Sequence, residues 1–451
     1  MLQHITEKRF MMNLQTYSTK MTPSLQEVFS LWNEKILPLL PKQLETIAQQ
    51  HQLLQRKRVL TSAFDMLRMF FLFASSGISL RMLSVAAASL GIATMSDTAW
   101  RKKLLASLSF LQQVLQMMLQ MMLPKSLSKQ QRRVLLVDGS LVRLQGKQQH
   151  QERVHLCYSL TENRMQQIKV TDYHTAETLS TFDFSPQDIV VADAGFGTVK
   201  NYVFALEQGT DVILRITPKR FPLFDSQGMQ LDLFAMLKEA EKKKQPILEV
   251  FGFCKEGTRW HLVRVLAQRL PKEKAKQAQQ RKRKKAQKNQ SQIQEDTLFF
   301  ANYLIVITSL GIEYSAEEVL FFYQSRWQIE LVFKRWKQHL SITTIRIASE
   351  AYAEVMILLW LLIWMITERQ AIQIERILQE KKEQTGQSTI LSCWEQCRYA
   401  YFQIKEILCF SWSLFVDFNN PNLSRLLAGH SGKRKNQNQE FRTSILPGLV
   451  F

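Results

Sequence analysis

The stretch SAEEVLFFYQSRWQIELVFKRWKQHL, from Ser315 to Leu340, decides how the rest of the chain is interpreted. Ser315 stands where an N-cap belongs, and Glu318 three residues later completes a capping box. Neither Gly nor Pro interrupts the stretch, so it predicts one continuous helix. The apolar side chains fall on one side of that helix and form its buried stripe: Phe322, Ile329, Phe333, Trp336 and Leu340.

Four polar side chains gather on another side of this helix. At ~100° per residue they fall within an arc of about 60°: Tyr323, Arg326, Glu330 and Lys337. A carboxylate flanked by cations at the edge of a buried face suits a metal ligand beside bound phosphates. An amphipathic helix with solvated charges gives the same short pattern, so further segments must decide between the two interpretations.

Two short apolar runs each lead to an aspartate. Residues 134–137 (VLLV) precede Asp138, and residues 188–192 (DIVVA) precede Asp193. Such runs are typical of buried strands. Further strands are predicted at residues 153–161, 165–171, 211–216 and 303–308. Meandering strands followed by alternating strand and helix predict a mixed α/β sheet covered by helices.

Strand ends and a covering helix can bring distant carboxylates together, so we expect Asp138, Asp193 and Glu330 to meet. Carboxylate oxygens with open positions are the ligands that Mg²⁺ prefers. Two such ions roughly 4 Å apart can activate a water or a 3′-hydroxyl and stabilise the leaving oxygen of a phosphodiester. The alternative is that the two aspartates are turn residues, since Asp-Gly is a common turn.

Three blocks in this order resemble a known family. Tyr323-x2-Arg326-x3-Glu330-x6-Lys337 resembles the Y-x2-R-x3-E-x6-K signature of the DDE transposases of bacterial insertion sequences, in the family numbered four. Asp138-Gly139-Ser140 resembles the first family block, and Asp193-Ala194-Gly195-Phe196 resembles the second. The second block continues into a strand carrying an arginine, for which Arg215 is the candidate. The resemblance covers about residues 133–345.

The resemblance implies an RNase H-like catalytic domain with a β-rich insertion between Asp193 and Glu330. It implies cut-and-paste movement of a DNA element, in which a strand is nicked, a hairpin forms and reopens, and a 3′-hydroxyl joins target DNA. By resemblance Asp138, Asp193 and Glu330 are catalytic and hold two Mg²⁺ ions, for which Mn²⁺ can substitute. Residues expected to contact DNA are Tyr323, Arg326 and Lys337. Trp327 and the insertion residue Trp260 are the candidates for stacking on a flipped base.

The resemblance also implies partners and a location. The partners are double-stranded DNA, as terminal inverted repeats and target DNA, and a second copy of the chain in a synaptic homodimer. The protein is expected in the bacterial cytoplasm, associated with the nucleoid. The predicted organisation is a helical DNA-binding region at residues 1–130 and catalytic segments at 131–216 and 301–380. The β-rich insertion occupies 217–300, and a helical, dimerising region occupies 381–451.

Composition supports a polyanionic partner. Lys and Arg number 59 and Asp and Glu 39, which gives a net charge of +20 over 451 residues. This charge favours nucleic acid or an anionic membrane surface. The most apolar run, residues 355–366, has too few residues to cross a bilayer, which takes roughly 20, so a buried helix is predicted. The five scattered cysteines suit a reducing compartment.

Two cationic segments are further candidates for DNA contact. A helix at residues 80–90, a break at Gly91 and a second helix carrying Arg101, Lys102 and Lys103 resemble a DNA-reading helix pair. Residues 272–288 contain nine Lys or Arg and one acid, and are predicted to be a flexible basic loop able to clamp phosphates. The basic residues 433–435 lie in a predicted polar tail.

Two other functions fit the same residues. One is a different metal-dependent nuclease of the RNase H-like fold, such as an RNase H or a junction resolvase. The other is a non-catalytic DNA-binding protein derived from a transposase. The cations around Glu330 and the long insertion before it favour the transposase over the first. The complete set of carboxylates favours it over the second.

Overall fold

The computed structural model describes residues 30–54, 59–122, 132–143, 151–162, 164–339, 350–385 and 393–409. The chain divides into two compact units, which are described separately. Unit 1 comprises Met1–Met118 and Ile347–Phe451, and unit 2 comprises Leu119–Arg346. Leu340, the basic residues 433–435 and the helices predicted beyond Cys409 lie outside the described residues.

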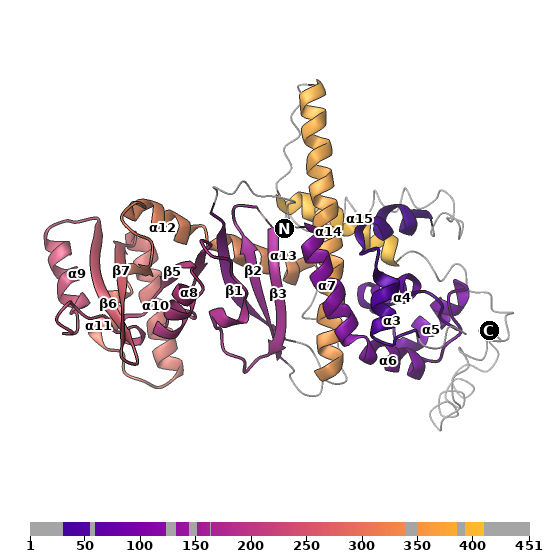
Figure 1. Cartoon of the computed structure of the whole chain (residues 1–451), viewed down its shortest axis with the longest axis horizontal. Helices are drawn as coiled ribbons and strands as arrows, with labels where there is room; N and C mark the ends of the chain where they lie inside the picture. Colours follow the sequence, from indigo (N-terminus) through magenta and orange to yellow (C-terminus); the bar gives the residue numbers. More distant parts are fainter. Residues whose placement is uncertain are drawn as a thin grey trace, which may run out of the picture. The chain divides into compact units, whose positions relative to one another are not determined.

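Unit 1 is helical throughout its described part, as predicted. Its elements are η1 (Trp32–Ile36), η2 (Leu37–Leu39), α3 (Leu44–Gln50), α4 (Ala63–Ser76), α5 (Leu80–Ser89), α6 (Asp97–Ala106), most of α7 (Leu108–Met122), α14 (Glu350–Thr385) and α15 (Cys393–Cys409). In Figure 1 the N-terminal helices are indigo to purple, α14 is orange and α15 is yellow.

The predicted helix pair of unit 1 is present as α5 and α6. Ser96 caps α6 by accepting a hydrogen bond from the backbone of Ala99 at 3.2 Å. Gly91 takes a left-handed backbone, with φ of 67°, and so breaks the chain between the helices. Arg101 and Lys102 are exposed. Lys103 is committed to structure, because its ammonium donates to the carbonyl oxygen of Leu53.

The apolar run of residues 355–366 lies inside α14 and is buried throughout, which confirms the predicted buried helix. The helix is longer than the run, however. Within α14, Tyr352–Leu378 has the length and hydropathy of a membrane span. The prediction that the apolar segment is too short to cross a bilayer is therefore wrong. Burial gives the better argument, since 78% of the apolar window is covered within the protein. The core helix of a folded domain has this property.

Unit 2 is built on one mixed sheet of eight strands, in the order β3-β2-β1-β4-β5-β8-β7-β6. The strands are β1 (Val134–Arg143), β2 (Gln151–Ser159), β3 (Arg164–Asp172), β4 (Ile189–Ala192), β5 (Asp211–Arg215), β6 (Ile247–Glu256), β7 (Arg259–Arg269) and β8 (Tyr303–Thr308). Figure 1 labels β1, β2, β3, β5, β6 and β7. The adjacent strands β1, β4 and β5 are parallel, and the other pairs are antiparallel. The predicted mixed α/β sheet is therefore confirmed.

The predicted β-rich insertion contains a hairpin of β6 and β7, which does not build a separate sheet. β7 pairs with β8 from Arg264–Thr308 to Arg269–Tyr303, so the hairpin extends the main sheet. The helices of unit 2 are α8 (Val199–Glu207), α9 (Leu233–Lys242), α10 (Lys272–Lys288), α11 (Glu295–Phe300), α12 (Ala316–Gln324) and α13 (Trp327–His339), with short turns η3 (Leu179–Thr181) and η4 (Pro218–Arg220).

The main core of unit 2 lies on one face of the sheet. To this core α8 contributes Tyr202 and Val203, and α9 contributes Leu237. Val137 of β1 and Ala192 of β4 point into this core. Because successive side chains of a strand alternate between faces, the residue after each of these two points to the opposite face.

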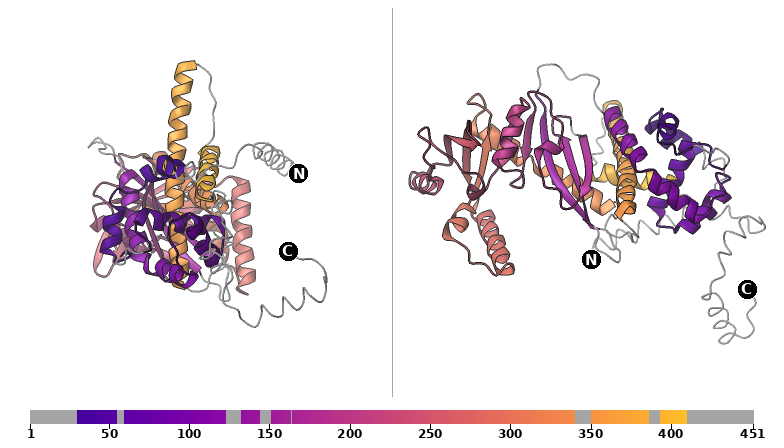
Figure 2. Two further views of the ribbon diagram at one scale, coloured as in Figure 1. Left: turned by 90° about the vertical axis from the view of Figure 1, so that its right-hand side faces the viewer. Right: turned by 60° about the horizontal axis from the view of Figure 1, so that its bottom comes forward.

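The predicted basic loop is wrong: residues 272–288 form α10, a helix of 17 residues. Its composition explains the difference, since Lys, Arg, Gln, Glu and Ala are all good helix formers. Ala275 is buried, and the Gln279 amide donates to Asn302 Oδ1 at 2.8 Å, which docks one side of the helix. The nine cations are exposed, and Figure 2 shows α10 projecting beside the sheet.

Candidate active site

Asp138 and Asp193 lie side by side where the parallel pairing of β1 and β4 ends. The last residues in register are Val137 and Ala192, and the aspartates are the next residue on each strand. Neighbouring strands are about 4.8 Å apart, so the two carboxylates share one edge of the sheet. Both point to the face opposite the main core, because Val137 and Ala192 point into it.

Asp138 does not end its strand, contrary to the prediction. β1 continues to Arg143 and pairs with β2, with Asp138 opposite Leu156 and Gly139 opposite His155. The Asp-Gly step is therefore extended strand and not a turn, which also removes the turn alternative for Asp138. β1 is paired with both β2 and β4 up to Val137, and from Asp138 onward it is paired with β2 alone.

The stretch of residues 315–340 begins with the predicted capping box. The Ser315 hydroxyl accepts from the Glu318 backbone at 3.2 Å, and the Glu318 carboxylate accepts from the Ser315 backbone at 2.8 Å. The predicted single helix is wrong, however, because α12 ends at Gln324 and α13 begins at Trp327. The Arg326 amide bonds to the Tyr323 carbonyl, three residues back, as in a tighter turn.

The predicted arc of about 60° assumes one continuous helix. The break between α12 and α13 means that it does not describe how residues before and after Arg326 are oriented. Tyr323 and Arg326 nevertheless both reach the aspartates. The Tyr323 hydroxyl donates to Asp193 Oδ1 at 3.0 Å, and Arg326 Nη1 lies 3.8 Å from Asp138 Oδ2. Both side chains are largely covered, since Tyr323 is 6% exposed and the Arg326 side chain 13%.

Glu330 joins the site through Arg326. Arg326 Nη2 donates to Glu330 Oε1, while its Nη1 faces Asp138. The Glu330 side chain is 57% exposed, whereas that of Asp138 is 21% exposed. Across the described residues, no group of three His, Cys, Asp or Glu side chains is close enough to hold a metal. Arg326 thus links Asp138 and Glu330, and the three predicted ligands are not gathered around one point.

Lys337 and Trp327 occupy the two ends of α13. Lys337 Nζ donates to the Ser140 hydroxyl at 2.8 Å, on the strand residue two after Asp138 and so on the same face. Trp327 is 51% exposed at the first turn of α13. The predicted buried stripe is confirmed at Ile329, Phe333 and Trp336, and Phe322 is only partly buried.

Arg215 is the last residue of β5, and its Nη1 lies 3.7 Å from Asp193 Oδ1. Arg335 of α13 is a further cation close to these residues in sequence. It is 8% exposed, and its Nε donates to the Leu331 carbonyl at 3.3 Å. The insertion tryptophan, Trp260, is 45% exposed and packs edge-on against Phe224 at 5.3 Å between ring centroids.

The two aspartates differ in their electrostatic environment. Burial raises the pKa of Asp138 to about 6, and the charges of Glu177 and Asp193 add to the increase, although Arg326 and the Gly139 amide oppose it. Burial would also raise the pKa of Asp193, but Arg326, Arg215 and the Tyr323 hydroxyl hold it below the usual 3.8. Nearby positive charges and hydrogen-bond donors therefore stabilise the ionised form of Asp193 more than that of Asp138.

The arginine and tyrosine of the site respond to the same charges. Burial lowers the pKa of Arg326, but Tyr323, Asp193 and Glu330 raise it overall, so the guanidinium stays charged. Burial and the Asp193 charge raise the pKa of Tyr323 to about 12, so its phenol keeps the proton that it donates.

Two residues at the site have no predicted role. Ser140 belongs only to the first family block, and the sequence does not single out Glu177. Glu177 lies between β3 and η3 and forms an ion pair with Arg153 at 2.7 Å. No motif marks it, because only the folded loop brings it to the aspartates.

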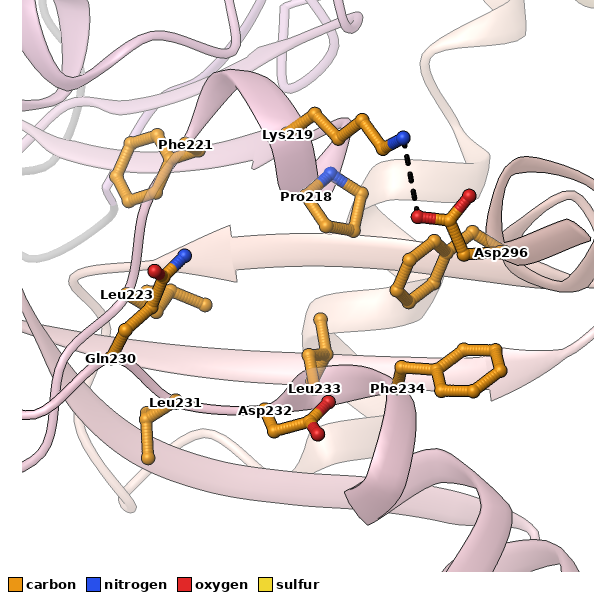
Figure 3. Close-up of a pocket in the computed structure, with 11 residues that line it drawn as sticks. Pro218, Lys219, Phe221, Leu223, Gln230, Leu231, Asp232, Leu233, Phe234 and Asp296 are labelled. Carbon is orange, nitrogen blue, oxygen red and sulfur yellow. Dashed lines mark ion pairs between the residues drawn. The ribbon is translucent and has the colours of Figure 1, made fainter. Parts of the chain in front are cut away.

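A cavity of about 360 Å³ lies elsewhere in unit 2, in the insertion (Figure 3). Lys219 and Asp296 form an ion pair of 3.2 Å beside it, and its walls include Phe221, Leu223 and Leu233. None of the predicted catalytic residues lines it. The predicted catalytic residues Asp138 and Asp193 therefore lie outside this cavity, where the parallel pairing of β1 and β4 ends.

Comparison with known proteins identifies the family of this chain. The family model described as "Transposase DDE domain" matches residues 129–366, a range that includes both aspartates, α12 and α13. The transposase for insertion sequence element IS421 of Escherichia coli is 29% identical over 324 residues, which are 70% of this chain and 87% of that protein. InsL of element IS186A from E. coli strain K12 is 29% identical over 323 residues, with the same shares.

Proposed function

This chain belongs to the DDE transposases of insertion sequences, and we propose that it moves a DNA element by cut-and-paste transposition, through metal-dependent strand cleavage and strand transfer. The observation that carries the proposal is the pair Asp138 and Asp193, adjacent on parallel strands. Arg326, between α12 and α13, lies beside Asp138, and Tyr323 of α12 donates a hydrogen bond to Asp193. In this proposal the mixed sheet with its flanking helices is an RNase H-like catalytic domain.

The residues at the sheet edge fit a divalent cation. Their donors are carboxylate oxygens, and burial together with neighbouring acids raises the pKa of Asp138, which marks negative charge that a cation would offset. Asp138, Asp193 and Glu330 would hold two Mg²⁺ ions, with Mn²⁺ as a substitute. When bound, the ions supply activation of a water or 3′-hydroxyl and stabilisation of the leaving oxygen.

The other residues of the site orient these ligands and bind DNA. The Tyr323 hydroxyl fixes the orientation of Asp193 by its hydrogen bond. Arg326 holds Glu330 beside Asp138 and presents a buried, fully charged guanidinium, which suits a phosphate at the cut. Lys337, on the Asp138 face, adds a second phosphate contact, and the exposed indole of Trp327 offers a surface for base stacking.

Regions outside the sheet complete the proposal. The helical segment of residues 1–130, with α5 and α6, is proposed to recognise the terminal inverted repeats, and residues 381–451 to contribute to a homodimer in the synaptic complex. The catalytic domain comprises residues 131–216 and 301–380, with the insertion at 217–300. The net charge of +20 supports double-stranded DNA as the partner at both the element ends and the target. The proposed location is the bacterial cytoplasm, at the nucleoid.

The deciding experiment uses the DNA that flanks the gene. A labelled fragment carrying the terminal repeat is incubated with the full chain and Mg²⁺, and products are separated on denaturing gels. We expect a nick at the element end, then a hairpin, then joined target DNA. A nuclease of another kind would cut without end specificity or strand joining. A non-catalytic derivative would bind the fragment and leave it intact.

A further inference from the structure

The Glu177 carboxylate lies against the backbone of both aspartate segments. A Cβ placed on Gly139 would be 2.9 Å from Glu177 Oε1, and one placed on Gly195 would be 2.4 Å from Glu177 Oε2. Gly139 directly follows Asp138, and Gly195 is two residues after Asp193. One carboxylate oxygen thus faces each segment, and only residues without a side chain permit that approach.

The carboxylate is held in place from its own side of the sheet. Arg153 Nη1 lies 2.7 Å from Glu177 Oε1, and Arg153 Nη2 donates to the Tyr173 carbonyl at 3.2 Å. The side chains of Arg153 and Glu177 are 17% and 27% exposed. Partly buried ion pairs of this kind keep one geometry better than exposed ones do.

The loop that carries Glu177 is also tied to the turn after Asp193. The Asn201 side-chain oxygen accepts from the backbone of Leu179 at 3.0 Å and from the Thr178 hydroxyl at 3.0 Å. The Asn201 amide nitrogen donates to the Phe196 carbonyl at 2.9 Å. Asn201 is 3% exposed, so these bonds are shielded from water. The loop and the Asp193 segment are therefore linked as one structural element.

Glu177 approaches β1 from the side opposite the Asp138 carboxylate. Gly139 follows Asp138 in an extended strand, so a Cβ on Gly139 would point away from the Asp138 side chain, and it is this direction that meets Glu177. The position suits a residue that supports the backbone of the ligands and contributes charge from behind them. It does not suit a ligand in the same shell as Asp138.

On the basis of the proposed function, we propose that Glu177 is a positioning residue of the cation site. Its Arg153-held carboxylate sets the spacing of the Asp138 and Asp193 segments and supplies negative charge that strengthens cation binding. Residues that orient metal ligands from outside the first coordination shell commonly alter metal affinity by roughly ten-fold or more when replaced.

The first test measures Mn²⁺ binding to the full chain by calorimetry, together with the Mg²⁺ dependence of nicking. Glu177→Gln keeps the size of the side chain and removes its charge. We expect Mn²⁺ affinity to fall by roughly ten-fold, and nicking to recover in large part at high Mg²⁺. The control is Asp183→Asn, which removes an exposed acid of the same unit, with a side chain 92% exposed, and should bind as the wild type does.

Asp138→Asn separates the failure of this inference from that of the proposed function. If Asp138→Asn loses Mn²⁺ binding while Glu177→Gln binds normally, the role of Glu177 is wrong and the cation site stands. If Asp138→Asn binds Mn²⁺ as well as wild type does, the cation site itself is wrong, and the role of Glu177 fails with it.

A second pair of variants tests the contact. Gly195 does not have a left-handed backbone, so Gly195→Ala introduces a methyl group whose main conflict is with the Glu177 carboxylate. We expect Gly195→Ala to weaken Mn²⁺ binding in the wild-type background and to add little when Glu177 is already Ala. Equal effects in the two backgrounds would show that the residues act independently and would overturn the contact as the cause.

Discussion

Asp138 and Asp193 are the first residues beyond the Val137–Ala192 pair, so the register of two parallel strands places the two carboxylates side by side. This arrangement needs no loop to form it. Any change that shifts the β1–β4 register by one residue would move one carboxylate to the core face of the sheet. The spacing of the proposed ligands is therefore set by backbone hydrogen bonds, and their charge balance is set by Arg326.

Glu330→Gln should abolish strand cleavage while leaving DNA binding within a few-fold of wild type. The substitution preserves side-chain volume and removes a proposed metal ligand, whose partner Arg326 can still bond to the amide oxygen. Nicking of a labelled element end and gel-shift titration measure the two effects. Glu317→Gln, an exposed acid in the first turn of α12, is the matched control. Wild-type nicking by Glu330→Gln would remove Glu330 from the site.

Arg326→Ala and Lys337→Ala should each slow cleavage by orders of magnitude, because charge-assisted phosphate contacts that strengthen in the transition state have large effects. Lys334→Ala should remain within a few-fold, since Lys334 is exposed on the same helix and makes none of the site contacts described above. Single-turnover cleavage is the measurement, with thermal melting to check folding.

Lys334 is a better control than Arg335, whose burial makes a folding defect the expected result of substitution. A common loss of rate in all three variants would mean that bulk charge and not position governs cleavage. The shared-site argument for Arg326 and Lys337 would then fail.

The strands were predictable because their apolar runs are short, β-rich and bounded by polar residues, and this placed both aspartates correctly at one sheet edge. The helix break at Ser325–Arg326 was not predictable, because no Gly or Pro marks it. Tertiary contacts accompany it, above all those of Arg326 with Asp138 and Glu330. Local propensity favours a continuous helix there, and the packed structure overrides it.

Two further differences have equally physical causes. The continuation of β1 past Asp138 depends on pairing with β2, which no local pattern in Gly139-Ser140 reveals. Glu177 reaches the site through a loop tied down by Asn201, so its role depends on contacts between segments far apart in sequence. For α10, in contrast, the helix-forming composition is present in the sequence itself, and its high charge does not prevent a helix.

Neutralising the outer side of α10 should reduce the salt dependence of DNA binding. Arg281, Lys284 and Lys288 lie opposite the buried Ala275, so changing all three to Gln keeps the helix and its docking. If each contacts a phosphate of duplex DNA, the slope of log affinity against log salt should decrease by about 2.7, from about 0.9 per contact. Fluorescence anisotropy over a range of NaCl concentrations measures it.

The matched control for α10 neutralises the exposed lysines at the end of α9: Lys242, Lys243 and Lys244. It removes the same charge from the same unit at a different place. An equal change of slope in both triple variants would show that α10 acts through overall charge, and no change in the α10 variant would limit its role to solubility.

His155 should make the stability of unit 2 fall as the pH is lowered from about 6.5 to about 4. His155 is fully buried opposite Gly139, and its Nε2 is bonded to the Thr171 hydroxyl at 2.9 Å. Burial, with help from Arg153 and Lys169, lowers its pKa from 6.5 to about 4. Below 6.5 the unfolded chain takes up a proton that the folded chain refuses until about 4, so protonation favours unfolding in that window.

Replacing the imidazole isolates this effect from other titrating groups. His155→Gln can still bond to Thr171 but cannot titrate, so its loss of stability between pH 6.5 and 4 should be smaller than that of wild type by up to about 1.4 kcal/mol per pH unit. Asp138, whose raised pKa acts in the opposite direction, is present in both proteins and so cancels in the difference. Urea unfolding at a series of pH values gives the free energies, and His174→Gln, at an exposed position, is the control. Parallel pH profiles for wild type and His155→Gln would mean that the imidazole takes up its proton as readily in the folded chain as in the unfolded chain. The proposed cause of the acid sensitivity would then be wrong.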